Sequence, residues 1–401
     1  MFLSGNKDPN QHHPRSWFHK AVIYQVFIDR FSGVQTMENR AGFLGGNLRG
    51  VTGKIDYLRD LGINVIWLSP FCKTSAYHGY HVTDYMEVDP RFGTLEDLQE
   101  LIQAAHEREM RVIADLVPNH CSREHPYFRD AVENPGSKYR YWFMFEQWPR
   151  EYLTFLDYPE LPKLNLDNGE VSDYMTGVAS YWLSMGLDGF RLDHAIGPSH
   201  KFWRSFSRTI ERAYPGAALI GEVWAGGLDK RLFRTTGIRH KTLRRLKGIS
   251  QEKIQFEYAS VLHGVLDFAL RDILVHAVSR GLDPVSDVGV RQKVASHFRK
   301  VPPGFFMVTF LDNHDMNRFI RYCNGRVEPL LRAFELLLSL DQPVVIYTGT
   351  ENCMPNRIDV SMDNPGSDLQ VRAPVDWDHL NEAFINGFRS LANSRGFKSG
   401  S

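Results

Sequence analysis

The chain has 401 residues, 43% of them hydrophobic, which is enough for one large domain or roughly two to three ordinary ones with buried cores. Lys plus Arg and Asp plus Glu both number 47, so the formal net charge is zero, and we expect neither nucleic acid nor a membrane as a partner. The single basic cluster, at 239–248, has the spacing of a solvated helix face.

The cysteines and the N-terminus constrain the cellular setting. Four cysteines lie far apart without CxxC spacing, which predicts neither a structural zinc site nor a dense disulfide framework. Residues 1–17 lack the apolar core of a signal peptide, and the chain contains no apolar run long enough to span a membrane. We therefore expect a cytoplasmic protein, and the sequence leaves the oligomeric state open.

Eight short runs rich in β-branched and aromatic residues predict strands. They occupy residues 22–28, 64–69, 111–117, 189–193, 218–223, 264–268, 305–311 and 343–349. Helical patterns lie between most of them, as at 94–109, where Thr94 is the expected N-cap. Eight buried strands that alternate with helices predict an α/β fold in which a parallel sheet closes as a (β/α)8 TIM barrel.

The spacing between the third and fourth predicted strands is unusually long. Residues 119–175 are rich in Pro, Tyr, Trp and Phe, and a structureless loop of that length is improbable in a compact domain. We therefore predict an inserted subdomain that forms a wall or lid at the mouth of the barrel. The expected organisation is a first part of the barrel at 1–118, the insertion at 119–175 and the rest of the barrel at 176–401. No C-terminal β-sandwich domain is apparent after a last predicted helix.

Polar side chains gather where the predicted strands end. They are Asp115, Asn119, His120, Arg191, Asp193, Glu222, Asp312, His314 and Asp315. Each has an ordinary structural explanation alone, such as helix capping, an Asx turn or an ion pair. Because TIM barrels carry their chemistry at the C-terminal ends of the strands, their convergence on one rim favours a catalytic site.

The stretch GFRLDHA, residues 189–195, is the most informative part of that rim. In a strand, Arg191 and Asp193 point to the same side, so we expect the guanidinium to lower the pKa of Asp193 and keep it as an anion. Glu222 has apolar neighbours and no adjacent cation in sequence, which predicts a raised pKa. Glycoside hydrolysis uses a nucleophilic carboxylate next to a protonated carboxyl group. Tyr80 and Trp224 could stack on sugar rings.

Two other classes of function compete with hydrolysis. His78 and His81 form an HxxH pattern that, with the acids and His314, would suit a metal site, but no HExxH occurs and the histidines come from different loops. A carbohydrate-binding module would need exposed aromatic residues but not three placed acids. The carboxylates therefore favour an enzyme.

Four motifs in order resemble the signatures of the α-amylase superfamily, glycoside hydrolase family 13. They are DLVPNH (115–120), GFRLDHA (189–195), GEVW (221–224) and FLDNHD (310–315). The similarity starts near 21–31 and reaches VVIYTG, so it covers most of the chain. The segment LPKLN (161–165) resembles the fifth motif of neopullulanases, cyclomaltodextrinases and maltogenic amylases.

The resemblance implies a retaining hydrolase that cleaves α-1,4-glucosidic bonds in maltooligosaccharides, cyclodextrins or starch through a covalent glycosyl-enzyme intermediate. Asp193 would be the nucleophile, Glu222 the general acid/base and Asp315 the third acid, which stabilises the transition state. Asp115 would support the catalytic residues without contacting the substrate. The insertion would match the family's domain B. The residues expected to bind substrate are Tyr80, His120, Arg191, His314, Lys163, Asn165 and Trp224.

The need for calcium and the exact reaction remain open at this point. α-Amylases often carry Lys-His three and four positions after the nucleophile, where this chain has Ile196 and Gly197. Asn119 is a candidate calcium ligand, but one residue cannot supply the roughly six to eight oxygens that calcium takes, so we expect no required cofactor. A glucanotransferase or isomerising relative would share every catalytic residue, and a catalytically silent carbohydrate-binding relative is a further alternative.

Overall fold

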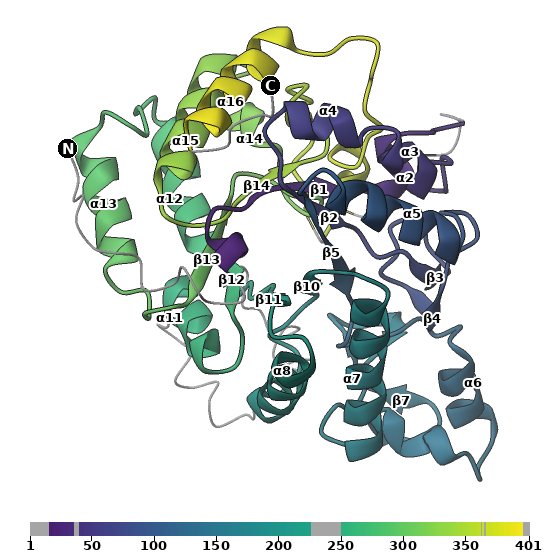
Figure 1. Cartoon of the computed structure of the whole chain (residues 1–401). Coiled ribbons are helices and arrows are strands. Elements are labelled where there is room, and N and C mark those ends of the chain that lie inside the picture. Colours follow the sequence, from purple (N-terminus) through teal and green to yellow (C-terminus); the bar gives the residue numbers. More distant parts are fainter. Residues whose placement is uncertain (1–15, 36–39, 226–249, 362, 365, 396–401) are drawn as a thin grey trace.

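The computed structural model describes residues 16–35, 40–225, 250–361, 363–364 and 366–395. The basic cluster at 239–248 lies outside these ranges, as do all but the last two residues of 1–17. Eight of the described strands pair in parallel and close a barrel in the order β1-β14-β13-β12-β11-β10-β5-β2 (Figure 1). They are β1 (Val22–Val26), β2 (Val65–Leu68), β5 (Arg111–Leu116), β10 (Gly189–Leu192), β11 (Ala218–Gly221), β12 (Gly264–Leu266), β13 (Phe306–Phe310) and β14 (Val344–Tyr347). Each lies within one predicted run, so the TIM-barrel prediction is confirmed.

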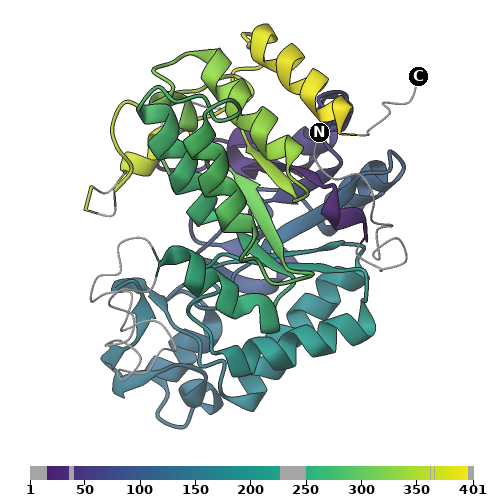
Figure 2. The same cartoon turned by 90° about the vertical axis from the view of Figure 1, so that its left-hand side faces the viewer.

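Helices cover the outside of the barrel (Figures 1 and 2). Between strands β1 and β10 the chain forms α2 (Ile28–Phe31), α3 (Leu48–Thr52), α4 (Ile55–Asp60), α5 (Leu95–His106), α6 (Pro126–Glu133), the 3₁₀ helix η1 (Lys138–Trp142) and α7 (Gly169–Ser184). The others are α1 (Ser16–His19), α8 (His200–Ala213), α11 (Gln251–Phe256), η2 (Glu257–Ser260), α12 (Phe268–Ser279), α13 (Val288–Phe298), α14 (Phe319–Tyr322), α15 (Val327–Ser339), η3 (Ser367–Gln370) and α16 (Glu382–Ser394). None of the helices in the described part of the chain is long and apolar enough to cross a membrane.

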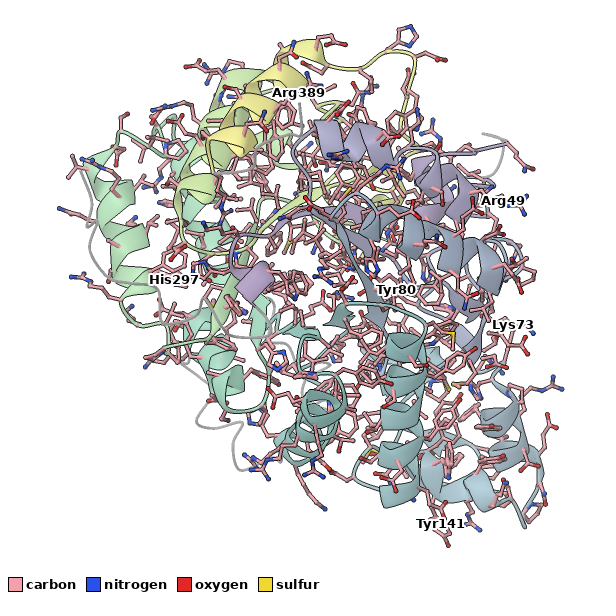
Figure 3. The ribbon with its side chains drawn as sticks, in the orientation of Figure 1. Arg49, Lys73, Tyr80, Tyr141, His297 and Arg389 are labelled. Carbon is pink, nitrogen blue, oxygen red and sulfur yellow. The ribbon has the colours of Figure 1, made fainter. Side chains whose placement is uncertain are left out.

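Helix α5 illustrates how local sequence sets the element boundaries. Its predicted N-cap Thr94 accepts a hydrogen bond from the backbone of Asp97, whose side chain accepts one from the backbone of Thr94. This capping box satisfies two donors that the first turn would otherwise leave unpaired. At the other end of the chain, Arg389 of α16 donates to the carbonyl of Asp60 at 2.8 Å, so the last helix packs next to α4 and completes the ring (Figure 3).

The side chains on the two faces of each barrel strand pack into different parts of the core. Phe190 and Leu192 of β10 point outward into the large core between barrel and helices, whereas Ile113 and Ile220 on the neighbouring strands fill the barrel interior. Because side chains alternate along a strand, Arg191 must point inward. Gly189 begins β10 with φ of 153°, and a Cβ there would lie 2.3 Å from the carbonyl oxygen of Ala218, so the close approach of β10 and β11 requires glycine.

Small antiparallel hairpins border the mouth of the barrel. One pairs β3 (Cys72–Thr74) with β4 (Val82–Val88) after β2. Two more lie between β5 and α7, and they pair β6 (Phe145–Gln147) with β7 (Glu151–Tyr152) and β8 (Thr154–Phe155) with β9 (Tyr158–Pro162). With α6 and η1 they form the blue-teal lobe at the bottom of Figure 2. Helix α7 begins at Gly169, inside the 119–175 segment.

Candidate active site

A cavity of about 550 Å³ opens at the C-terminal ends of the barrel strands. The charged, histidine and aromatic residues that line it include His78, Tyr80, His81, His120, Phe155, Asp193, His194, Glu222, Trp224, His314, Asp315, Asp368 and Arg372. A cavity of about 590 Å³, lined by Arg204 and His263 among others, lies toward the N-terminal ends of the strands and contains none of the predicted catalytic acids. TIM barrels carry their chemistry at the C-terminal end, so the first cavity is the candidate active site.

Arg191 lies at the centre of the carboxylates and is 1% exposed. One guanidinium nitrogen, Nη1, donates to Asp115 at 2.8 Å and to Asp193 at 2.7 Å. The other, Nη2, lies 2.5 Å from Glu222 as an ion pair that is close but not aligned as a hydrogen bond. The predicted contact with Asp193 is confirmed, and the guanidinium is shared among three carboxyl groups.

Two expectations about these carboxyls were wrong. Burial raises the pKa of Asp193 well above its usual range, and Glu222, Asp115 and Asp315 raise it further, so Arg191 only offsets part of the effect. Glu222 has an adjacent cation, because the side chain of Arg191 extends past Asp193 to reach the end of β11. Three carboxyl groups surround one guanidinium, so the cluster has more acids than cations. Such a cluster favours keeping one proton, which the acids share.

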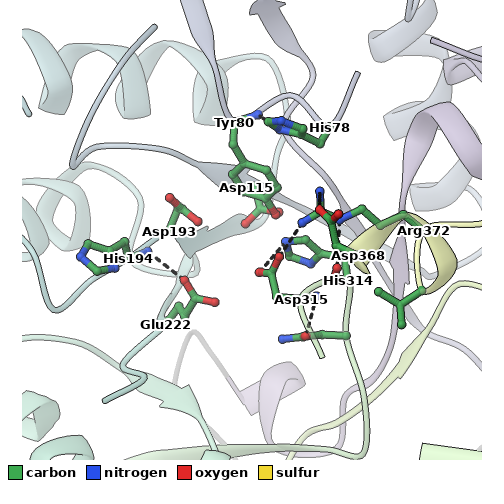
Figure 4. Close-up of polar contacts among 12 residues, drawn as sticks. His78, Tyr80, Asp115, Asp193, His194, Glu222, His314, Asp315, Asp368 and Arg372 are labelled. Atoms are coloured by element: carbon green, nitrogen blue, oxygen red, sulfur yellow. Dashed lines mark hydrogen bonds and ion pairs between the residues drawn. The ribbon is translucent and has the colours of Figure 1, made fainter. Parts of the chain in front are cut away.

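Asp315 occupies a different electrostatic environment on the other side of the cavity (Figure 4). Its carboxylate lies 3.0 Å from Nε2 of His314 and accepts a hydrogen bond from Arg372 at 2.7 Å. Burial opposes ionisation of Asp315, but His314 and Arg372 outweigh it and hold the pKa below its usual range. Asp315 is therefore ionised near pH 7.

Sequence reasoning missed Arg372. It follows η3, and besides Asp315 it contacts the carbonyl of His314 at 2.9 Å and the carboxylate of Asp368 at 2.5 Å. Burial and the surrounding acids affect the pKa of Arg372 in opposite directions, and the net effect is to raise it. The spacing of Asp368 and Arg372 was a weak signal, since i,i+4 ion pairs are common on exposed surfaces.

The rings of Tyr80 and His314 stack on each other next to the acids. Their rings are stacked with centroids 5.1 Å apart and planes 7° apart. The hydroxyl of Tyr80 donates to Asp115 at 3.0 Å, and Gln25 lies 2.9 Å from Nδ1 of His314, which together fix both rings. Figure 3 shows Tyr80 near the centre of the molecule, and Figure 4 shows it directly above Asp115.

Two further histidines line the cavity near the insertion. The ring of His120 stacks on Phe155 of β8 at 4.6 Å, and the ring of His194 meets Phe155 edge-on at 4.7 Å. Burial lowers the pKa of His120 to about 3 and that of His194 well below its usual range, so both rings are neutral near pH 7. His194 lies within GFRLDHA, yet sequence reasoning assigned it no role.

The structure does not place all predicted substrate-binding residues in the cavity. Trp224 lines it and stacks on Phe268. Lys163 is 5% exposed and donates to the carbonyl of Gly197 at 2.8 Å, and Asn165 donates to the carbonyl of Tyr141 at 3.1 Å. Neither Lys163 nor Asn165 is among the described residues that line the cavity. Their side chains instead bind backbone carbonyls.

The residues around Asn119 do not fit a calcium ion. Its buried Oδ1 has no hydrogen-bond partner among the described residues, which would suit a ligand, but the neighbouring carbonyl of Gly197 already accepts a hydrogen bond from Nζ of Lys163. Burial lowers the pKa of Lys163 to about 7, and in either protonation state its N–H occupies an oxygen that a calcium ion would need. Within the described ranges, no group of three or more His, Cys, Asp or Glu residues is arranged to hold a metal, and this includes His78 and His81.

Comparisons with known proteins agree with this geometry. The family model described as "Alpha amylase, catalytic domain" matches residues 25–394. The chain belongs to the α-amylase family. It is 32% identical over 391 residues to alpha-amylase 2 of Dictyoglomus thermophilum, and 31% identical over 387 residues to a cyclomaltodextrinase of a Bacillus species. These alignments cover 94% and 91% of this chain but 63% of each relative, so the chain spans less than two thirds of their length.

A solved structure supports the same family. The chain superposes on the cyclic α-maltosyl-(1→6)-maltose hydrolase of Arthrobacter globiformis with a TM-score of 0.81 and 27% identity. The match covers 96% of this chain and 84% of that one. The α-amylase-family resemblance that the four motifs implied is therefore confirmed.

Replacing Arg191 tests the central ion-pair cluster. Arg191→Met should lower the free energy of unfolding by about 3–5 kcal/mol near pH 7, because it leaves three buried carboxyls without their cation. Without the guanidinium nothing offsets the burial of Asp193, and its folded-state pKa rises further, so the loss should shrink as the pH falls and Asp193 becomes protonated. Denaturant unfolding at several pH values measures both effects.

Arg108 provides the matched control. It pairs with Asp56 at the surface, where solvent screens the interaction, so Arg108→Met should change stability much less than Arg191→Met at every pH. Equal losses in the two variants would contradict the special role assigned to Arg191.

Proposed function

We propose that the chain catalyses retaining hydrolysis of α-1,4-glucosidic bonds in short α-glucans. The observation that carries the proposal is the buried guanidinium of Arg191, which holds Asp193 and Glu222 together at the bottom of an open cavity. A pair of close carboxyls with different roles is what retaining glycoside hydrolysis needs. The names of the relatives, an alpha-amylase and a cyclomaltodextrinase, support this class of substrate.

In the first step, an oxygen of Asp193 attacks the anomeric carbon while the bond to the leaving oxygen breaks and Glu222 donates its proton to that oxygen. In the second step, Glu222 removes a proton from water, the water oxygen attacks the same carbon, and the bond to Asp193 breaks. Two inversions leave the product in the α configuration.

The charges described above suit these roles. The reaction needs one protonated carboxyl and one anion, and the excess of acids over cations around Arg191 favours a single proton shared within the cluster. The proposed mechanism requires that this proton lies on Glu222 when the substrate is bound. Asp315, ionised by its contacts with His314 and Arg372, is suited to stabilise positive charge on the sugar ring in the transition state. Asp115 acts indirectly, because it holds Arg191 and the hydroxyl of Tyr80.

The cavity walls suggest how the sugar binds. Tyr80 lines the cavity beside the acids, and His120 brings a buried Nε2 that has no hydrogen-bond partner among the described residues. Both ring nitrogens of His314 already have partners, Gln25 and Asp315, so we assign His314 the role of holding Asp315. Trp224 extends the aromatic lining. We assign Lys163 and Asn165 a supporting role instead, because their side chains bind the backbone carbonyls of Gly197 and Tyr141.

We further propose that the activity requires no calcium, since Nζ of Lys163 already donates to the carbonyl of Gly197 next to Asn119. Transfer to a sugar hydroxyl instead of water would use the same acids, so the product analysis below includes it as an outcome. An intracellular location stays a prediction.

Replacing the two acids separates their roles. Asp193→Asn and Glu222→Gln should each reduce turnover of maltotriose by about 10²-fold or more. α-Maltosyl fluoride distinguishes them, because fluoride leaves without help from an acid. Glu222→Gln should release a burst of about one fluoride per enzyme and then stall, whereas Asp193→Asn should release none.

Asp341→Asn, on an exposed acid that pairs with His19 far from the cavity, is the control and should behave like the unmodified chain. A fluoride burst in Asp193→Asn, or near-normal maltotriose turnover in either variant, would contradict the assigned roles.

Product analysis tests the reaction itself. Maltotriose and cyclodextrin should be cleaved with a higher kcat/KM than starch at equal glucose concentration, and proton NMR should detect the α anomer first. A first product with the β configuration would mean an inverting mechanism. Clear preference for starch would indicate ordinary α-amylase activity, and longer or rearranged products would indicate a transferase or isomerising enzyme.

Chelation tests the proposal about calcium. Activity on maltotriose and the thermal unfolding midpoint should be unchanged by EDTA, because the residues near Asn119 offer no suitable set of oxygen ligands. A lower midpoint in EDTA that calcium restores would show that the ion is needed.

A further inference from the structure

Helix α11 lies beside β11 and β12 and carries two glutamines that are four positions apart (Figure 1). Residues at this spacing share one face of a helix, so Gln251 and Gln255 extend from α11 in the same direction. Gln255 is 0% exposed. Burying an amide costs free energy unless its polar atoms are paired, so the partners of these side chains indicate why glutamine is present.

Gln251 pairs with the backbone on both sides of Trp224. Its Nε2 donates to the carbonyl of Val223 at 2.6 Å, and its Oε1 accepts from the backbone N–H of Ala225 at 2.8 Å. A side-chain amide offers a donor and an acceptor, so it can satisfy the N–H and the C=O of a chain segment together. The two hydrogen bonds fix the backbone that carries Trp224, just beyond the end of β11.

Gln255 forms the same kind of contact around Phe268. Its Nε2 donates to the carbonyl of Leu266 at 2.5 Å, and its Oε1 accepts from the backbone N–H of Ala269 at 3.3 Å. Phe268 begins α12 and packs edge-on against Phe310 of β13, with ring centroids 5.1 Å apart. One face of α11 therefore holds the chain on both sides of two aromatic residues.

These two aromatic residues pack on each other. The rings of Trp224 and Phe268 are stacked with centroids 5.8 Å apart and planes 14° apart. Phe268 is 2% exposed, whereas Trp224 is half-buried and lines the cavity. The place of the indole in the cavity wall therefore depends on the backbone positions of both residues.

Helix α11 is itself anchored to the rest of the barrel. Glu252, next to Gln251, lies 2.9 Å from Nδ1 of His297 on α13 (Figure 3). Nε2 of the same ring, which is 1% exposed, lies 2.8 Å from Asp267, the N-cap of α12. Ile254 packs into the core between barrel and helices. These contacts leave α11 little freedom to move, so its glutamines are fixed supports.

We propose that Gln251 and Gln255 are positioning residues for substrate binding, which hold the Trp224–Phe268 stack so that the indole can pack on a sugar ring. This inference rests on the proposed function and adds to it a support outside the cavity, since neither glutamine is among the described residues that line it. A residue that only stabilised the fold would affect binding independently of Trp224. A residue that positions Trp224 would have no further effect once the indole is removed.

A double-mutant cycle separates these two roles. The dissociation constant of maltohexaose is measured by calorimetry in chains that also carry Asp193→Asn, so that the sugar is not cleaved. Trp224→Ala and Gln251→Leu should each raise it about tenfold, because each removes the stacking contact. The double variant should bind about as weakly as Trp224→Ala alone, since the same contact cannot be lost twice.

Gln255→Met provides an independent second variant, which acts through Phe268 and should show the same lack of additivity with Trp224→Ala. Gln292→Leu is the matched control, because it removes an exposed glutamine on α13 and should leave the dissociation constant unchanged. Thermal unfolding of each variant confirms that the chain is folded at the temperature of the titration.

An unchanged dissociation constant in Gln251→Leu would overturn the proposal, as would a loss of about a hundredfold in the double variant, which is the product of two independent effects. A fall in kcat without weaker binding, measured with Asp193 intact, would show that Gln251 acts on Glu222 instead and would also overturn it. If the chain binds maltohexaose but does not cleave it, the proposed function fails, and the cycle still decides the role of the glutamines. Absence of binding would overturn both.

Discussion

The site depends on a single buried guanidinium shared by three carboxyl groups. Removing one arginine and three acids from water costs several kcal/mol per ion unless the geometry of the contacts is good. Arg191 meets that condition because Asp115, Asp193 and Glu222 all reach it within hydrogen-bond distance. The barrel must therefore hold three strands in one register.

The register supplies this geometry directly. Arg191 of β10 pairs with Asp115 of β5 on one side and with Ile220 of β11 on the other. Asp193 and Glu222 follow two residues beyond Arg191 and Ile220, so side-chain alternation brings all of them to the barrel interior. If the pairing register of β10 shifted by one residue, its inward side chains would point into the core between barrel and helices, where Phe190 and Leu192 pack.

Contacts between residues of the same strand could be predicted from the sequence. Contacts between residues far apart in the chain could not. Alternation along one strand is enough to put Arg191 beside Asp193, and the eight apolar runs are enough to locate the barrel. The cation beside Glu222 was missed because Arg191 lies 31 positions earlier in the chain, and Arg372 was missed because a long segment separates it from β14. The pKa of Asp193 could not be inferred from its neighbour alone, since burial and distant acids outweigh one arginine.

The cavity is lined by residues with two kinds of structural support. Arg191, Asp115 and the residues that follow β10 and β11 are tied to barrel strands, which have little freedom to move. Phe155 belongs instead to a two-residue strand of a hairpin, and it contacts both His120 and His194. Loops tolerate substitution better than barrel strands do. Changes in this hairpin can therefore reshape the cavity wall that Phe155 forms with His120 and His194, while the carboxyl cluster around Arg191 is left intact.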